Sequence, residues 1–86
     1  MAHYRIEARP RFDRDLAALP SQVRKRVIAK VETLADEPRP PGVKKLKGAD
    51  DLYRVRVGDY RIVYAIHDGI LLVILVRVRH RKEAYD

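Results

Sequence analysis

The apolar residues in the first half of the chain recur in patterns that predict one strand followed by two helices. Residues 3–8 alternate loosely between apolar and polar, which predicts a short first strand. Pro10 and Pro20 suit helix starts, and residues 11–19 and 21–36 carry apolar side chains at helical spacing. These apolar positions are Phe12, Leu16, Leu19, Val23, Val27, Val31 and Leu34. We therefore expect a helical hairpin that packs its apolar stripe against a sheet.

The second half of the chain predicts a long basic loop followed by three strands. Residues 36–51 contain three prolines and two glycines, a composition that predicts no regular structure, and they carry Lys44, Lys45 and Lys47. A loop of this length is often functional, although a solvated linker is an equal alternative. Strands are predicted at residues 52–57, 60–66 and 70–78. The whole chain, residues 1–86, is then one α+β domain ordered strand-helix-helix-strand-strand-strand, with a twisted, mainly antiparallel sheet.

The turn at Gly58 and Asp59 fixes which side chains share a face of the sheet. Two turn residues with glycine first favour a type II′ hairpin, so Val57 pairs with Tyr60 and Arg56 pairs with Arg61. Because paired residues share a face and each strand alternates, the two faces follow directly. One face carries Tyr53, Val55, Val57, Tyr60, Ile62 and Tyr64, and the other carries Arg54, Arg56 and Arg61.

The arginine face of this hairpin is a candidate anion site. Like charges opposed across strands are destabilising, and local conflicts of this kind tend to occur at functional sites. A solvated face neutralised by nearby carboxylates is the alternative, but the only acidic residues in this stretch, Asp50, Asp51 and Asp59, fall in turns. We favour the anion site.

The last strand brings more basic groups toward this face, in one of two registers. A turn of two residues after the third strand places Val76, Val78 and His80 on the arginine face, whereas a turn of three places Arg77, Arg79 and Arg81 there. The strand is apolar on both faces, so the pattern does not choose between them. Lys82 and Tyr85 follow closely.

Charge and composition narrow the class of partner. Nineteen Lys and Arg against twelve Asp and Glu give a formal net charge of +7, which favours a polyanion such as nucleic acid, a ribosome surface or an acidic protein. There are no cysteines, so disulfides and cysteine-based zinc sites are excluded, and the carboxylates do not cluster as metal ligands. We expect no cofactor and no metal. With no apolar leader and no long apolar run, we expect a cytoplasmic protein without a membrane partner.

Two segments together resemble the RelE/ParE toxin superfamily. They are YRVRVGDYRIVY at residues 53–64 and the basic tail RVRHRKEAY at residues 77–85. The resemblance implies a RelE-like fold and the toxin of a type II toxin–antitoxin pair, a metal-independent endoribonuclease that cuts mRNA in the A site of the 70S ribosome. It implies catalytic roles for Arg54, Arg56, Arg61, Arg81 and Tyr85. An acidic, helical, RelB-like antitoxin is the implied partner.

Arginine chemistry suits RNA cleavage but leaves the proton acceptor open. The planar fork of arginine matches the oxygens of a phosphate on which charge grows, but it does not readily deprotonate. RelE ribonucleases often have lysine on the second strand, where this chain has Arg54 and Arg56. That leaves His80 or Tyr85 as the candidate base, and only histidine titrates near neutrality without perturbation. A surface role for His80 is an equal alternative.

Additional contacts to RNA or the ribosome are expected from the remaining basic residues of the loop and tail. These are Lys44, Lys45, Lys47, Arg77, Arg79 and Lys82. Two other functions stay open. One is a ParE-like inhibitor of DNA gyrase, and the other is an inactive homologue that only binds its antitoxin and represses its own operon.

Overall fold

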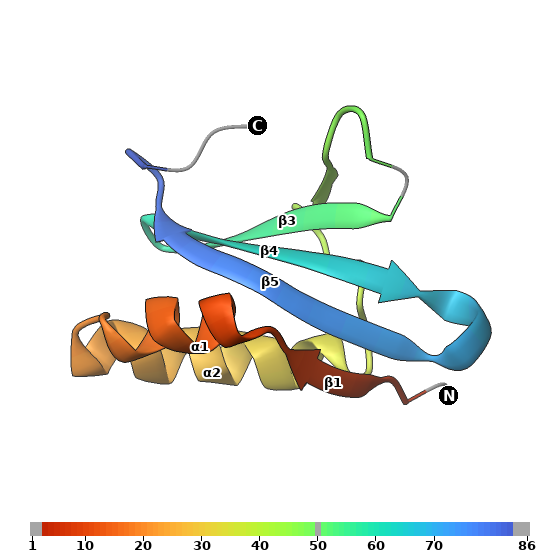
Figure 1. Cartoon of the computed structure of the whole chain (residues 1–86), viewed down its shortest axis with the longest axis horizontal. Helices are drawn as coiled ribbons and strands as arrows, with labels where there is room; N and C mark the ends of the chain where they lie inside the picture. Colours follow the sequence, from red (N-terminus) through yellow and green to blue (C-terminus); the bar gives the residue numbers. More distant parts are fainter. Residues whose placement is uncertain (1–2, 50, 84–86) are drawn as a thin grey trace.

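The computed structural model describes residues 3–49 and 51–83, which form two helices on one face of a five-stranded sheet (Figure 1). The elements, in chain order, are β1 (Arg5–Ala8), α1 (Pro10–Ala17), α2 (Ser21–Leu34), β2 (Lys44–Lys45), β3 (Leu52–Val57), β4 (Tyr60–His67), the 3₁₀ turn η1 (Asp68–Ile70) and β5 (Leu72–His80). The strand order is β1-β5-β4-β3-β2, and only the β1–β5 pair is parallel. The α+β class and the layered arrangement predicted from the sequence are confirmed.

The helices form where the apolar stripe and the prolines predict them. Pro10 occupies the first turn of α1, and Pro20 directly precedes α2. Phe12, Val27 and Leu34 are almost completely buried against the sheet. The other stripe positions, Leu16, Leu19, Val23 and Val31, are partly buried against the same core. Burial of this stripe supplies the main driving force that fixes the helices on the sheet.

The β3–β4 hairpin has the register predicted from its turn. Val57 pairs with Tyr60, Arg56 with Arg61 and Val55 with Ile62. Gly58 has a φ of 58°, the positive value that a type II′ turn requires at its first position. Val55, Ile62 and Tyr64 are buried beneath the helices, so the predicted core wall is confirmed.

The segment between α2 and β3 is less irregular than predicted. Lys44 and Lys45 form the edge strand β2, in which Lys44 pairs with Arg54 and Lys45 pairs with Tyr53. The free edge of β3 offers unpaired backbone groups, and two extended residues are enough to use them. The prediction that residues 36–51 contain no regular structure is therefore wrong at these two positions.

Two side-chain contacts attach this segment to the sheet. The buried hydroxyl of Tyr64 donates a 2.7 Å hydrogen bond to the carbonyl of Pro38. Arg39 donates to both carboxylate oxygens of Asp68, at 3.1 and 2.9 Å, and its guanidinium lies over the ring of Tyr53. The hydroxyl of Tyr4 also donates to Asp68, at 2.6 Å. These contacts hold the start of residues 38–45 against the sheet and so position β2.

The boundaries of the outer strands differ from those expected. β1 begins at Arg5, and β5 runs from Leu72 to His80 rather than over residues 70–78. The turn before β5 is neither of the predicted lengths, because His67 pairs with Leu72 across four residues. The first three of them form the 3₁₀ turn η1, and the fourth, Leu71, takes a left-handed φ of 52°.

Candidate functional site

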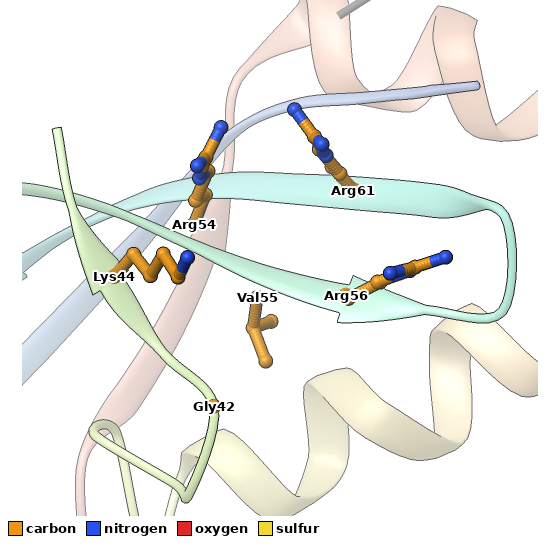
Figure 2. A pocket seen from close by; sticks show the side chains of 6 residues that line it. All are labelled: Gly42, Lys44, Arg54, Val55, Arg56 and Arg61. Carbon is orange, nitrogen blue, oxygen red and sulfur yellow. The ribbon is translucent and has the colours of Figure 1, made fainter. Parts of the chain in front are cut away.

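Three arginines of the β3–β4 hairpin lie on the sheet face opposite the helices. Arg54 and Arg56 are two residues apart on β3, and Arg61 of β4 is the cross-strand partner of Arg56. Figure 2 shows Arg54 and Arg61 pointing to one side of the hairpin while Val55 points to the other, toward the helix. We call these three residues the arginine face. The register confirms that the three residues share a face, whereas the side chain of Arg56 turns along the strand and also lines a cavity with Arg26 and Lys30 of α2.

A β-bulge adds a fourth arginine to this surface. Tyr64 pairs with Leu75 but Val63 pairs with Arg77, so Val76 is the extra residue in β5. Beyond the bulge, Arg79 pairs with Arg61. Without the extra residue, the register set by His67 and Leu72 would put Val78 opposite Arg61. Bulges often re-aim side chains beside functional sites, and this one places an arginine next to the arginine face.

Arg77 is engaged by helix α1. Its Nε donates to Oδ2 of Asp15 at 2.7 Å and its guanidinium reaches Oδ1 at 3.2 Å. Asp15 also accepts the backbone N–H of Val78 at 3.2 Å, beyond the point where β1 ends. Both charged side chains of the pair are largely buried. This arrangement gives Arg77 a role in closing the edge of β5 against α1.

Two cavities border the arginine face, and two residues line both of them. The first has a volume of about 280 Å³ and is lined by Gly42, Lys44, Arg54, Val55, Arg56 and Arg61 (Figure 2). The second, of about 410 Å³, is lined by Lys44, Lys45, Leu46, Lys47 and Arg54. Lys44 and Arg54 belong to both, so the two cavities adjoin along β2. Among the described residues that line either cavity, all the charged ones are cations.

Burial and the positive charges that lie close together on the arginine face lower the pKa of Arg54. Burial lowers the pKa of its guanidinium below the ordinary value, and the nearby charge of Arg61 lowers it further. Arginine still stays protonated at any physiological pH. A group held in this way gains from an anion placed between the two guanidiniums, because the anion relieves their mutual repulsion.

Arg56 and Arg81 are held by the hairpin turn. Nε of Arg56 donates to the carbonyl of Gly58 at 2.9 Å, and Figure 2 shows its side chain directed along the strand toward the turn. The backbone N–H of Arg81 donates to the carbonyl of Asp59 at 2.7 Å, and its Nε lies 3.8 Å from the Asp59 carboxylate. Both therefore lie near the hairpin tip. The side chain of Arg81 is half exposed.

His80 is not brought to the arginine face. It pairs with Tyr60, whose ring belongs to the helix-facing side, and the two rings meet edge to face with centroids 5.1 Å apart. Nδ1 of His80 accepts the backbone N–H of Lys82 at 3.1 Å. The alternative that placed His80 on the face of Arg61 is therefore wrong. Of the other predicted set, Arg79 lies opposite Arg61. The side chain of Arg77 binds Asp15 of α1 instead, and Arg81 lies beside Asp59 at the hairpin tip. Tyr85 lies outside the described residues.

The cavity wall formed by Gly42 and Lys44 was the part of the site that the sequence pattern did not locate. Gly42 has a φ of 87°, a conformation that favours glycine and lets the chain turn into β2. The lysines at 44, 45 and 47 were predicted contacts, but a two-residue strand has no periodicity that reveals which of them faces the arginines. Within residues 3–49 and 51–83, His, Asp and Glu side chains form no group of three that could hold a metal ion. No helix in that part of the chain is long and apolar enough to span a membrane.

The sequence matches a model of a toxin family. Residues 6–85 match the family described as the ParE toxin of the type II toxin–antitoxin system parDE. Among curated proteins, the putative toxin RelE1 of Methanocaldococcus jannaschii is 33% identical over 85 residues, which cover 95% of this chain and 94% of that protein. The family model thus carries the ParE name, whereas the relative carries the RelE name.

Solved structures of RelE proteins share the fold. The archaeal RelE–RelB complex of Pyrococcus horikoshii contains a chain that superposes with a TM-score of 0.83 at 30% identity, covering 98% of this chain and all of that one. A chain of the RelBE2 toxin–antitoxin complex of Mycobacterium tuberculosis gives a TM-score of 0.82, also at 30% identity, and covers 92% of this chain and 99% of its own. Sequence and structure thus point to the same group of proteins.

Proposed function

The chain belongs to the RelE/ParE family of toxins from type II toxin–antitoxin systems, and on this premise we propose that it is a ribosome-dependent endoribonuclease that cuts messenger RNA in the ribosomal A site. The observation that carries the proposal is the arginine face, with Arg79 beside it and a cationic cavity at its edge. A ribonuclease needs such a cluster to hold a phosphate while charge develops on it.

We assign each of these arginines a different role in the cleavage reaction. The 2′-hydroxyl attacks the adjacent phosphorus, and negative charge grows on the two non-bridging oxygens. Arg54 and Arg61 line the first cavity and present planar forks that match those oxygens bidentately. Arg56 and Arg79 flank Arg61 on the neighbouring strands and contact the next phosphates along the RNA. Arg81, near the hairpin tip, stays a predicted catalytic residue. The basic groups Lys45, Lys47 and Lys82 add contacts to the surrounding RNA.

Dependence on the ribosome fits a site on an open sheet face. The arginines hold a phosphate from one side, and a free RNA chain would sample many conformations on such a surface. Alignment of the attacking 2′-oxygen with the leaving 5′-oxygen is worth several orders of magnitude in rate. A ribosome that fixes the A-site codon would supply this alignment. The basic surface of the toxin would supply the toxin's affinity for ribosomal RNA.

An acidic antitoxin is the second proposed partner. The structures from Pyrococcus horikoshii and Mycobacterium tuberculosis contain a RelE-type toxin in complex with its antitoxin. The net charge of +7 favours an antitoxin rich in Asp and Glu, which would neutralise the same surface that binds RNA.

Tyr85 remains a predicted catalytic residue of the proposed site, and His80 remains a weaker one.

The experiment that tests the proposal is primer extension on a defined mRNA in a purified translation system. Wild-type protein should produce cuts within A-site codons when ribosomes are present and none when the same mRNA is free. Gyrase supercoiling, measured in parallel, should be unaffected. Inhibition of gyrase without mRNA cleavage would instead support the ParE-like function, and inactivity of folded protein in both assays would support a homologue that only binds its antitoxin.

A further inference from the structure

Lys44 occupies a distinct place in the first cavity. It extends from β2 toward the Arg54 side of β3, and its Cα is the cross-strand partner of Arg54 (Figure 2). Its side chain lines both adjoining cavities, so it stands where a bound RNA would pass from one to the other. The segment that carries it is attached to the sheet through Tyr64 and Arg39, so this position is set by the fold.

Among the described residues that line the first cavity, this lysine is the one that can release a proton. Gly42 and Val55 contribute no polar side-chain group, and the guanidiniums of Arg54, Arg56 and Arg61 donate hydrogen bonds without releasing their protons. An ammonium group, by contrast, has three donor protons and can release one. Of the six described residues that line the cavity, Lys44 alone combines positive charge with a transferable proton.

Building on the proposed ribonuclease function, we propose that Lys44 is the general acid that protonates the leaving 5′-oxygen. As the 2′-oxygen bonds to phosphorus, the P–O5′ bond breaks and its electron pair remains on the 5′-oxygen. That oxygen takes a proton from Nζ of Lys44, which gives a 5′-hydroxyl, a 2′,3′-cyclic phosphate and a neutral amine. The proton of the 2′-hydroxyl passes to the general base of the proposed site, and the amine regains a proton from solvent.

Substitutions at Lys44 can distinguish proton donation from the effect of positive charge alone. Lys44→Arg keeps the charge and most of the reach but cannot release a proton, so single-turnover cleavage on the ribosome should fall by about 10²-fold or more, the usual contribution of a general acid. Lys44→Ala should fall at least as far. Lys25 is an exposed lysine on α2, and Lys25→Arg and Lys25→Ala are the matched controls that should cleave like wild type.

A modified substrate tests the proton transfer itself. An mRNA in which sulfur replaces the bridging 5′-oxygen at the cut site releases a thiolate, which leaves without a proton. Both Lys44 variants should cleave this mRNA at close to the wild-type rate. Full activity of Lys44→Arg on ordinary mRNA, or a defect of Lys44→Ala that persists on the sulfur-containing mRNA, would overturn the inference alone. Failure of the wild-type protein to cleave any ribosome-bound mRNA would overturn the proposed function and this inference together.

Discussion

Arg79 lies directly opposite Arg61 across β4 and β5, and it does so only because Val76 is an extra residue in β5. Arg56 lies opposite Arg61 on its other side, in β3. Three neighbouring strands thus each place an arginine in one row, about 5 Å apart from strand to strand. The repulsion within this row is a cost in the free toxin that a bound polyanion removes.

The row of arginines predicts a specific salt dependence. Each phosphate contact contributes about −0.7 to the slope of log affinity against log salt for single-stranded nucleic acid. Arg79→Ala should therefore weaken binding to a single-stranded RNA oligonucleotide and make the slope shallower by roughly that amount. Fluorescence anisotropy over a range of salt concentrations measures both quantities. Arg11→Ala, which removes an exposed arginine from α1, should leave the slope unchanged, and an equal change in both variants would show that only net charge matters.

The register of the hairpin could be predicted from the sequence, whereas that of β5 could not. Gly58 and Asp59 form a two-residue turn, and such a turn fixes every pair that follows it. The turn before β5 has four residues and is followed by the bulge at Val76, so two irregularities combine to set where Arg79 lies. Neither leaves a signal in a strand that is apolar on both faces.

The position of Lys44 in the site could not be predicted from the sequence either, for a different reason. Its neighbours Lys45 and Lys47 have the same chemistry, and β2 is too short to show alternation. What distinguishes Lys44 is its pairing with Arg54, which depends on the attachment of residues 38–45 to the sheet. Likewise, His80 and Arg79 are adjacent in sequence, and only the bulge decides which of them reaches the arginine face.

Loss of the Tyr64 hydroxyl should affect stability and activity together. Tyr64→Phe removes the buried hydrogen bond to the carbonyl of Pro38, which should lower the free energy of unfolding by about 1 kcal/mol. Because that bond fixes the segment carrying Lys44, cleavage should fall as well, which urea denaturation and single-turnover kinetics would measure. Tyr60→Phe removes a hydroxyl from the same face of β4 and is the control. If Tyr64→Phe were as stable and active as the control, the anchoring role would be refuted.

The Arg39–Asp68 pair predicts an acid-sensitive contribution to stability. Hydrogen bonds from Arg39, and then from Tyr4, lower the pKa of Asp68 from 3.8 to about 2. A carboxylate whose pKa is lower in the folded state stabilises the fold above the unfolded pKa, and this contribution is lost as pH falls through the folded pKa. Asp68→Asn should therefore be less stable than wild type at pH 7, with the difference shrinking between about pH 4 and pH 2.

Thermal unfolding of wild type and Asp68→Asn over this pH range tests that expectation. Both proteins should melt at nearly the same temperature near pH 2, where Asp68 is about half protonated in the folded wild type and most of its charge-dependent contribution to stability is lost. A difference in melting temperature that stays constant from pH 7 to pH 2 would mean that the aspartate acts through packing and not through its charge.

The central claim is that the arginine face is the catalytic surface of a ribosome-dependent ribonuclease. Single-turnover cleavage of an mRNA programmed in the ribosomal A site, compared for wild type, Arg61→Ala and Arg11→Ala at saturating toxin, tests it most directly. Arg61→Ala should cleave roughly 10² to 10³-fold more slowly, the loss typical when one group that stabilises the transition state is removed. Arg11→Ala should match wild type. Equal cleavage by the two variants would contradict the assignment of the arginine face as the site of the reaction.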